Sequence, residues 1–189
     1  MLFYRITIAL MAAAALFQSP AAAADPVPPT APEGLATAVF AGGCFWCVES
    51  DFEKLDGVRD VISGYSGGLG REPTYKSHEG HLEAAQITYD PLVISYGELV
   101  DYLLRHIDPT DADGQFCDRG HSYKSAIFAA NADEWAAAKA AVGKASAELG
   151  QEVVTPILDR SDFWRAEEYH QDYYKKNPLR YKYYRTACG

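Results

Sequence analysis

The order of hydrophobic patterns between residues 36 and 176 is the feature that most constrains the fold. Apolar residues alternate in some segments, which is typical of strands, and recur every three to four residues in others, which is typical of helices. The expected strands are 37–43, 58–68, 81–91, 121–130 and 152–159, and the expected helices are 44–57, 95–107, 132–150 and 166–176. Their order is β-α-β-β-α-β followed by α-β-α.

This order predicts an α+β fold, a ferredoxin-like split βαβ sandwich with an additional C-terminal helix and coil. A doubly wound sheet fits less well. The glycine-rich, polar loop from Gly67 to Gly80 is long for a simple hairpin, and long ordered loops are often functional.

The N-terminal residues 1–24 have the layout of a secretory signal peptide. Their apolar run, Ile6 to Phe17, is shorter than the ~20 apolar residues that span a bilayer, so we expect no stable membrane insertion. Ala22 and Ala24 fit the small-x-small cleavage rule. We therefore expect an exported, periplasmic protein, cleaved near Ala24.

The mature chain is expected to contain a leader and one domain. Residues 25–35 hold four prolines and should form an extended, poorly packed leader. Residues 36–189 have the length of one domain, which can bury a core without disulfides. The net charge of −9 argues against a nucleic-acid partner.

The four cysteines are Cys44, Cys47, Cys117 and Cys188. Two structural bridges are one interpretation, because exported thiols tend to oxidise. A bridge between Cys44 and Cys47 would close too short a loop to constrain the unfolded chain much. We expect no metal, because Cys117 and Cys188 are isolated from each other and from any histidine pair.

The stretch "FAGGCFWCVES" predicts a reactive cysteine at a helix start. If the helix begins at Cys44, the helix dipole and free backbone N–H groups should lower the pKa of its thiol. Gly42 and Gly43 suit a sharp turn with positive φ and leave room for another molecule. Phe45 and Trp46 then provide either apolar walls for a small apolar group of the substrate or part of the core.

Cys47 follows one helical turn after Cys44 and indicates a redox pair. Their Cβ atoms should lie roughly 5 to 6 Å apart. A disulfide needs a separation of about 3.5 to 4.5 Å, which a non-helical first residue would allow.

Several longer motifs resemble one family. They are "GGCFWCVE" at Gly42–Glu49, "GYSGG" at Gly64–Gly68, "PTY" at Pro73–Tyr75, "GHLEAAQITYDP" at Gly80–Pro91, "DGQFCDRGHSYKSAIF" at Asp113–Phe128 and "EEYHQDYYKKNP" at Glu167–Pro178. Across nearly all of the mature chain, the sequence is similar to the methionine sulfoxide reductase A family, the peptide-methionine (S)-S-oxide reductases.

The resemblance implies a reaction for the motif cysteine. Cys44 would attack the sulfoxide sulfur while an acid, matched by Glu83, protonates the oxygen, which gives methionine and a cysteine sulfenic acid. Burial beside aromatic side chains would raise the pKa of Glu83 enough to hold that proton. Tyr75 and Tyr123 match tyrosines that donate hydrogen bonds to the sulfoxide oxygen.

The resemblance also implies the substrate contacts. Phe45 and Trp46 match the apolar pocket for the methyl group, and Asp118 matches a carboxylate that supports the site or binds substrate. The substrate would be methionine-S-sulfoxide, free or in oxidised exported proteins that the enzyme repairs. No metal or organic cofactor is implied, only an external dithiol reductant such as a thioredoxin-like protein.

The sequence departs from the commonest family motif, which has glycine at the position of Cys47. Cys47 and Cys188 are therefore both candidates to resolve the sulfenic acid, and a relay can use both. We expect Cys188 on a mobile terminal segment. We interpret Cys117 as a buried thiol of the pocket wall.

Two alternatives stay open. A thioredoxin-like disulfide oxidoreductase would explain the cysteine pair at a helix start and the later Thr155-Pro156, although the element order argues against it. A secreted binding module would use the tyrosine-rich tail 169–185 to dock on a partner or stack on nucleic acid. The tail fits better as a terminal helix and coil that wraps the domain.

Overall fold

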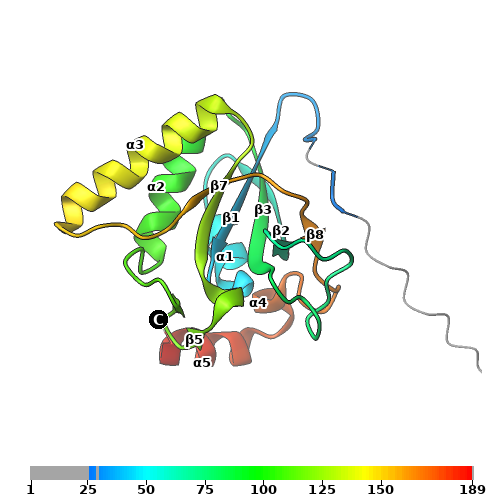
Figure 1. Cartoon of the computed structure of the whole chain (residues 1–189). Coiled ribbons are helices and arrows are strands. Elements are labelled where there is room, and N and C mark those ends of the chain that lie inside the picture. Colours follow the sequence, from blue (N-terminus) through cyan, green and yellow to red (C-terminus); the bar gives the residue numbers. More distant parts are fainter. Residues whose placement is uncertain (1–25, 29, 189) are drawn as a thin grey trace, which may run out of the picture.

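A six-stranded sheet forms the centre of the computed structural model, which describes residues 26–28 and 30–188 (Figure 1). The expected signal peptide, residues 1–24, lies outside the described residues. The strands of this sheet are β1 Ala36–Gly42, β2 Val58–Ser66, β3 Leu82–Tyr89, β6 Ser125–Ala129, β7 Ile157–Asp159 and β8 Trp164–Arg165.

The strand order is β7-β6-β1-β3-β2-β8. Strands β6 and β7 pair in parallel, and every other neighbouring pair of this sheet is antiparallel. The α+β class is confirmed. The central order β6-β1-β3-β2 is compatible with a split βαβ arrangement.

Three of the helices pack on one face of this sheet, and the last two lie at its lower end in Figure 1. The helices are α1 Phe45–Phe52, α2 Tyr96–His106, α3 Ala132–Leu149, α4 Tyr173–Lys176 and α5 Pro178–Cys188. A 3₁₀ turn, η1 His121–Tyr123, follows a small hairpin of β4 Gly114–Gln115 and β5 Asp118–Arg119. Among the described residues, no helix has the length and apolar character needed to cross a membrane.

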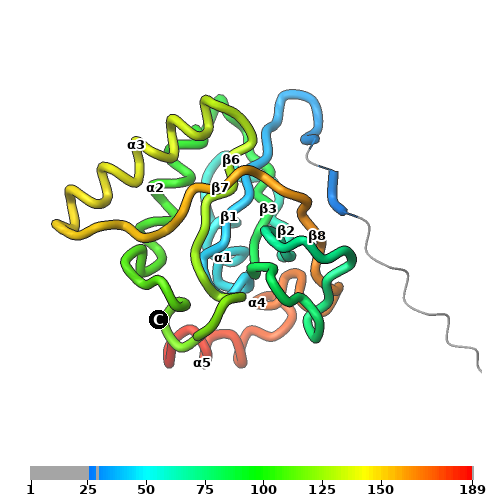
Figure 2. The backbone as a smooth tube through the Cα atoms, in the orientation of Figure 1, coloured from blue at the N-terminus to red at the C-terminus, as the bar shows by residue number. Residues whose placement is uncertain are grey.

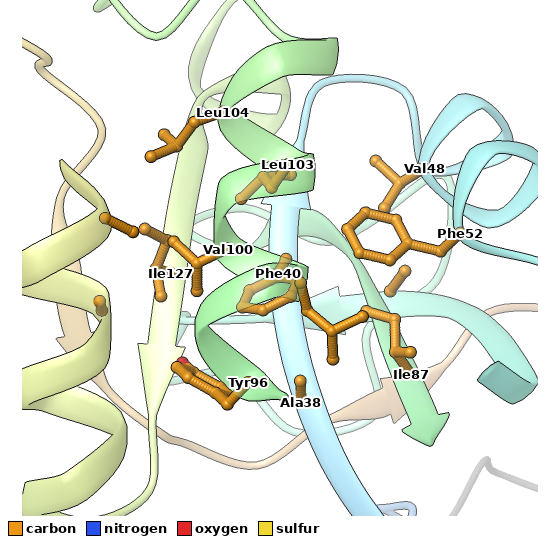
Figure 3. Close-up of a cluster of buried hydrophobic side chains, with 14 of the residues drawn as sticks. Ala38, Phe40, Val48, Phe52, Ile87, Tyr96, Val100, Leu103, Leu104 and Ile127 are labelled. Atoms are coloured by element: carbon orange, nitrogen blue, oxygen red, sulfur yellow. The ribbon is translucent and has the colours of Figure 1, made fainter. Parts of the chain in front are cut away.

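Alternation along the strands separates two packed faces. Phe40 of β1 points toward the helices, where it packs among Phe52, Val100 and Leu103 in the main core (Figure 3). Val39 belongs to a second cluster on the opposite face, which Phe163 covers. Figure 2 shows the segment between α3 and β8, which includes β7 and passes from one edge of the sheet to the other.

The C-terminal third differs most from the expected elements. The expected strand 152–159 is a strand only at β7, and the expected helix 166–176 is helical only at α4. Long-range hydrogen bonds explain the loop before α4. Gln171 bonds the backbone N–H and C=O of Ser63 at 3.0 and 2.9 Å, and the Asp172 N–H donates to Glu49 Oε1 at 2.9 Å.

Two other expectations need correction. The strand expected from residue 121 begins at Ser125, because residues 121–123 form η1. The leader 25–35 is not poorly packed throughout, since the Val27 N–H donates to the Phe163 carbonyl at 2.8 Å.

Candidate active site

Cys44 lies in the turn between the central strand β1 and helix α1. Gly43 makes this turn with φ +84°, and a Cβ at this position would lie 2.6 Å from Cβ of Gln115, so glycine is needed for both conformation and space. Cys44 itself is the non-helical residue that precedes α1, with φ −58° and ψ 118°, and is 8% exposed. The turn predicted from the two glycines is confirmed at Gly43.

Cys44 and Cys47 are both free thiols and form a hydrogen-bonded pair. The pKa of Cys44 is raised because its thiol donates to Cys47 and because it is buried. The pKa of Cys47 is lowered to about 7, because it accepts from Cys44 and lies beside the positive charge of Arg185. The expectation that the helix start lowers the pKa of Cys44 is therefore wrong for the resting site. Cys47 holds the more acidic thiol.

Glu83 is buried on strand β3 directly beside the start of α1. It is 2% exposed, and its Oε2 accepts a hydrogen bond from the Phe45 N–H at 3.1 Å. Burial raises the pKa of Glu83 to about 8, with the nearby charge of Asp118 adding to the shift and the Phe45 bond opposing it. The carboxyl group therefore retains its proton at neutral pH.

Tyr75 and Tyr123 share one small cavity with Cys44 and Glu83. The two tyrosines are hydrogen-bonded to each other, and burial raises the pKa of each. Both phenols therefore keep their protons and can donate hydrogen bonds to an oxygen atom in this cavity.

Phe45 and Trp46 form an aromatic side of the same cavity. Phe45 is 1% exposed and packs against Tyr65, so it is core and cavity wall at once. The Trp46 ring stacks on Tyr173 with 3.7 Å between ring centres. Its Nε1–H donates to His170 Nδ1 at 3.1 Å, which fixes the orientation of the indole.

The C-terminal helix contributes residues that the sequence analysis missed. Tyr184 lines the cavity with Cys44, and its hydroxyl donates to the Asp118 carboxylate. Arg185 donates to Asp51 Oδ2 at 2.6 Å and lies beside Cys47. The spacing of Tyr181, Tyr184 and Cys188 would have shown that they share one helix face.

Cys117 and Cys188 are joined by a disulfide bond. The interpretation of Cys117 as a buried thiol is wrong, because the residue is exposed in the turn between β4 and β5. The interpretation of Cys188 on a mobile segment also needs correction, because it ends helix α5.

A thiol pair beside a protonated carboxyl group and phenolic donors defines a thiol-dependent oxidoreductase site. The model of the family "Peptide methionine sulfoxide reductase" matches residues 36–189. MsrA 2 of Rhizobium meliloti is 54% identical over 154 residues, which cover 80% of this chain and 78% of the relative. The chain therefore belongs to the peptide methionine sulfoxide reductase family. This membership excludes the thioredoxin-like alternative.

Solved structures agree with this assignment. Reduced Mxr1 of Saccharomyces cerevisiae is 31% identical and superposes with a TM-score of 0.73 over 78% of this chain and 88% of that one. The same yeast protein in complex with Trx2 is 27% identical, with a TM-score of 0.56 over 76% of this chain and 87% of that one.

Proposed function

We propose that this chain reduces methionine-S-sulfoxide, free or within oxidised proteins, to methionine. The observation that supports this most directly is a carboxyl group, Glu83, that keeps its proton to about pH 8 in the same cavity as the Cys44 thiol. Sulfoxide reduction needs both groups together, a nucleophile at sulfur and an acid at oxygen.

The reaction begins when the substrate enters the cavity with its oxygen toward Glu83. The Cys47 thiolate, which accepts the hydrogen bond of the Cys44 thiol, takes up the proton of Cys44 as the Cys44 sulfur attacks the sulfoxide sulfur. Glu83 gives its proton to the oxygen, while Tyr75 and Tyr123 stabilise the charge that develops there. Methionine leaves, and Cys44 is left as a sulfenic acid.

The aromatic wall of the cavity fits the methyl group of the substrate. Phe45 and the fixed indole of Trp46 offer apolar surface beside Cys44. Asp118, whose carboxylate accepts a hydrogen bond from Tyr184, lines the same cavity and supports the site. The chemistry requires no metal or organic cofactor.

The sulfenic acid is resolved by Cys47, the neighbour already hydrogen-bonded to Cys44. Cys47 attacks the Cys44 sulfur, an S–S bond forms and water leaves. An external dithiol protein of the thioredoxin type then supplies electrons. The solved complex of yeast Mxr1 with Trx2 supports this partner class.

The N-terminal sequence supports export to the periplasm, where the enzyme would repair oxidised exported proteins. Cleavage near Ala24 would leave the domain from residue 36 intact. Cell fractionation and N-terminal sequencing of the mature chain test this. A chain that retains Met1 in the cytoplasm would refute export.

Turnover of the two epimers of a blocked methionine sulfoxide with dithiothreitol tests the function. We expect reduction of the S epimer only. An untouched sulfoxide, together with reduction of insulin disulfides, would instead assign dithiol exchange to the cysteine pair.

A further inference from the structure

The four cysteines form two pairs of opposite accessibility. Cys44 is buried, Cys47 is partly buried, and both are free thiols. Cys188 is also partly buried, whereas Cys117 is exposed, and these two are bonded to each other. The order Cys44, Cys47, Cys188, Cys117 therefore leads from the buried nucleophile to the protein surface.

Helix α5 brings the two pairs together. Cys44, Cys47 and Cys188 line one cavity, whose wall also includes Tyr184 and Arg185. The ion pair of Arg185 with Asp51, 2.6 Å long, anchors this helix beside α1. Cys188 is thus held at the same cavity as the thiols that become oxidised in each turnover.

Accessibility limits which bond an external protein can reduce. Thiol–disulfide exchange needs a thiolate to reach a sulfur atom of the bond it breaks. A folded dithiol protein cannot reach the buried sulfur of Cys44, which shares its cavity with Tyr184 of α5. Cys47 is only partly exposed and lies beside Arg185 of the same helix. Cys117, by contrast, is an exposed residue in the turn between β4 and β5.

We propose that Cys117 is the terminal redox residue of this enzyme and that the Cys117–Cys188 disulfide is the bond that the external dithiol protein reduces. This inference rests on the proposed function. It gives Cys117 a catalytic role in the regeneration of Cys44, and it makes Cys188 the carrier between the buried and exposed cysteines.

The exchange steps balance without any further oxidant. The Cys188 thiolate attacks Cys47 in the Cys44–Cys47 disulfide, so Cys44 leaves as a thiolate and takes up the proton that Cys188 lost. The Cys117 thiolate then attacks Cys188 in the Cys47–Cys188 bond, and Cys47 leaves and is reprotonated. The external dithiol finally reduces Cys117–Cys188 and becomes a disulfide itself.

The structure has the cysteine oxidation states that are expected after the two exchange steps within the protein, before the external dithiol reacts. Cys44 and Cys47 are thiols while Cys117 and Cys188 are oxidised. The lowered pKa of Cys47, about 7, makes it a good leaving group in the second exchange.

A single-turnover experiment tests the relay. The fully reduced mature chain is mixed with one equivalent of methionine-S-sulfoxide without reductant, quenched with an alkylating reagent at successive times, and mapped by mass spectrometry. We expect a Cys44–Cys47 disulfide that forms and decays, followed by Cys117–Cys188, with Cys44 and Cys47 alkylated at the end. Cys117 and Cys188 that both stay alkylatable while Cys44 remains in a disulfide would overturn the proposal.

Cys117→Ser separates the relay from a purely structural bond. The variant should release methionine once per chain and then turn over at least ~10-fold more slowly with thioredoxin as reductant. Ala187→Ser, next to Cys188 on an exposed part of α5, is the matched control and should turn over like the wild type. Equal steady-state rates for Cys117→Ser and the control would overturn the relay. Failure of the reduced wild type to release any methionine would instead overturn the proposed function.

Discussion

The two cysteine pairs of this protein show what burial does to a thiol. Cys44 is 8% exposed and shares a cavity with Glu83, whose raised pKa depends on exclusion from water. Cys117 is exposed, and it is not among the residues that line the cavity of Glu83. The buried pair can perform the chemistry but cannot meet a protein reductant, whereas the exposed pair can meet the reductant but cannot protonate a sulfoxide.

The largest effect is expected from Cys44→Ser. A serine hydroxyl is a far weaker nucleophile toward sulfur than a cysteine thiolate, so methionine formation should fall more than ~10³-fold. The Cys117–Cys188 bond of the variant should still be reduced by dithiothreitol. Amino-acid analysis measures the methionine formed. If Cys44→Ser forms methionine at the wild-type rate, Cys44 is not the nucleophile.

Glu83→Gln tests the acid of the buried pair. The amide cannot transfer the proton, so the first-turnover rate should fall about 10²- to 10³-fold. Glu79→Gln, an exposed glutamate in the loop before β3, is the control and should keep the wild-type rate. If both variants react alike in quenched-flow measurements, burial of Glu83 has no catalytic role.

Gly43→Ala tests the turn that presents Cys44. A methyl group would meet Gln115 at 2.6 Å in a backbone conformation that alanine avoids, so the free energy of unfolding should fall by roughly 2 to 4 kcal/mol. The control Gly143→Ala, in the exposed interior of α3 with open space around it, should raise stability by about 0.5 to 1 kcal/mol. Equal urea midpoints for the two variants would show that the turn does not require glycine at position 43.

The smallest effect is expected where α5 contacts the buried pair. Tyr184→Phe removes the hydrogen bond to Asp118, and a bond of about 0.5 to 1.5 kcal/mol corresponds to a roughly 2- to 12-fold loss of kcat/KM. The neighbouring Tyr183 is 78% exposed, so Tyr183→Phe is the matched control. If Tyr183→Phe lowers kcat/KM as much as Tyr184→Phe does, the hydrogen bond from Tyr184 to Asp118 makes no specific contribution to the reaction.

The sequence was sufficient where a local pattern determines structure. The strand-glycine-cysteine-helix order predicted the turn at Gly43, and the alternation of β3 predicted a strand that carries Glu83. The motifs led to the family and so to the cavity residues, including Tyr75 and Tyr123.

The parts that depend on distant contacts could not be predicted. The loop before α4 is fixed by Ser63 and Glu49, more than a hundred residues away in the chain. The pKa order of the two active-site thiols depends on Arg185 and on their own hydrogen bond, rather than on the helix dipole. No spacing rule could pair Cys117 with Cys188, since 71 residues separate them.

The pH dependence of the first turnover tests the central claim, that a buried, protonated Glu83 works with Cys44. The reduced chain is mixed with the S epimer over a range from mildly acidic to strongly alkaline pH. Because burial raises the pKa of Glu83 to about 8, the rate should be lost above that pH by about tenfold per pH unit. Below about pH 7 the rate should also fall, because the pKa of Cys47 is about 7 and its thiolate takes up a proton. Glu83→Gln should be slow and lack this alkaline decline. A wild-type rate that stays constant well above pH 8, or a decline that persists in Glu83→Gln, would contradict the account.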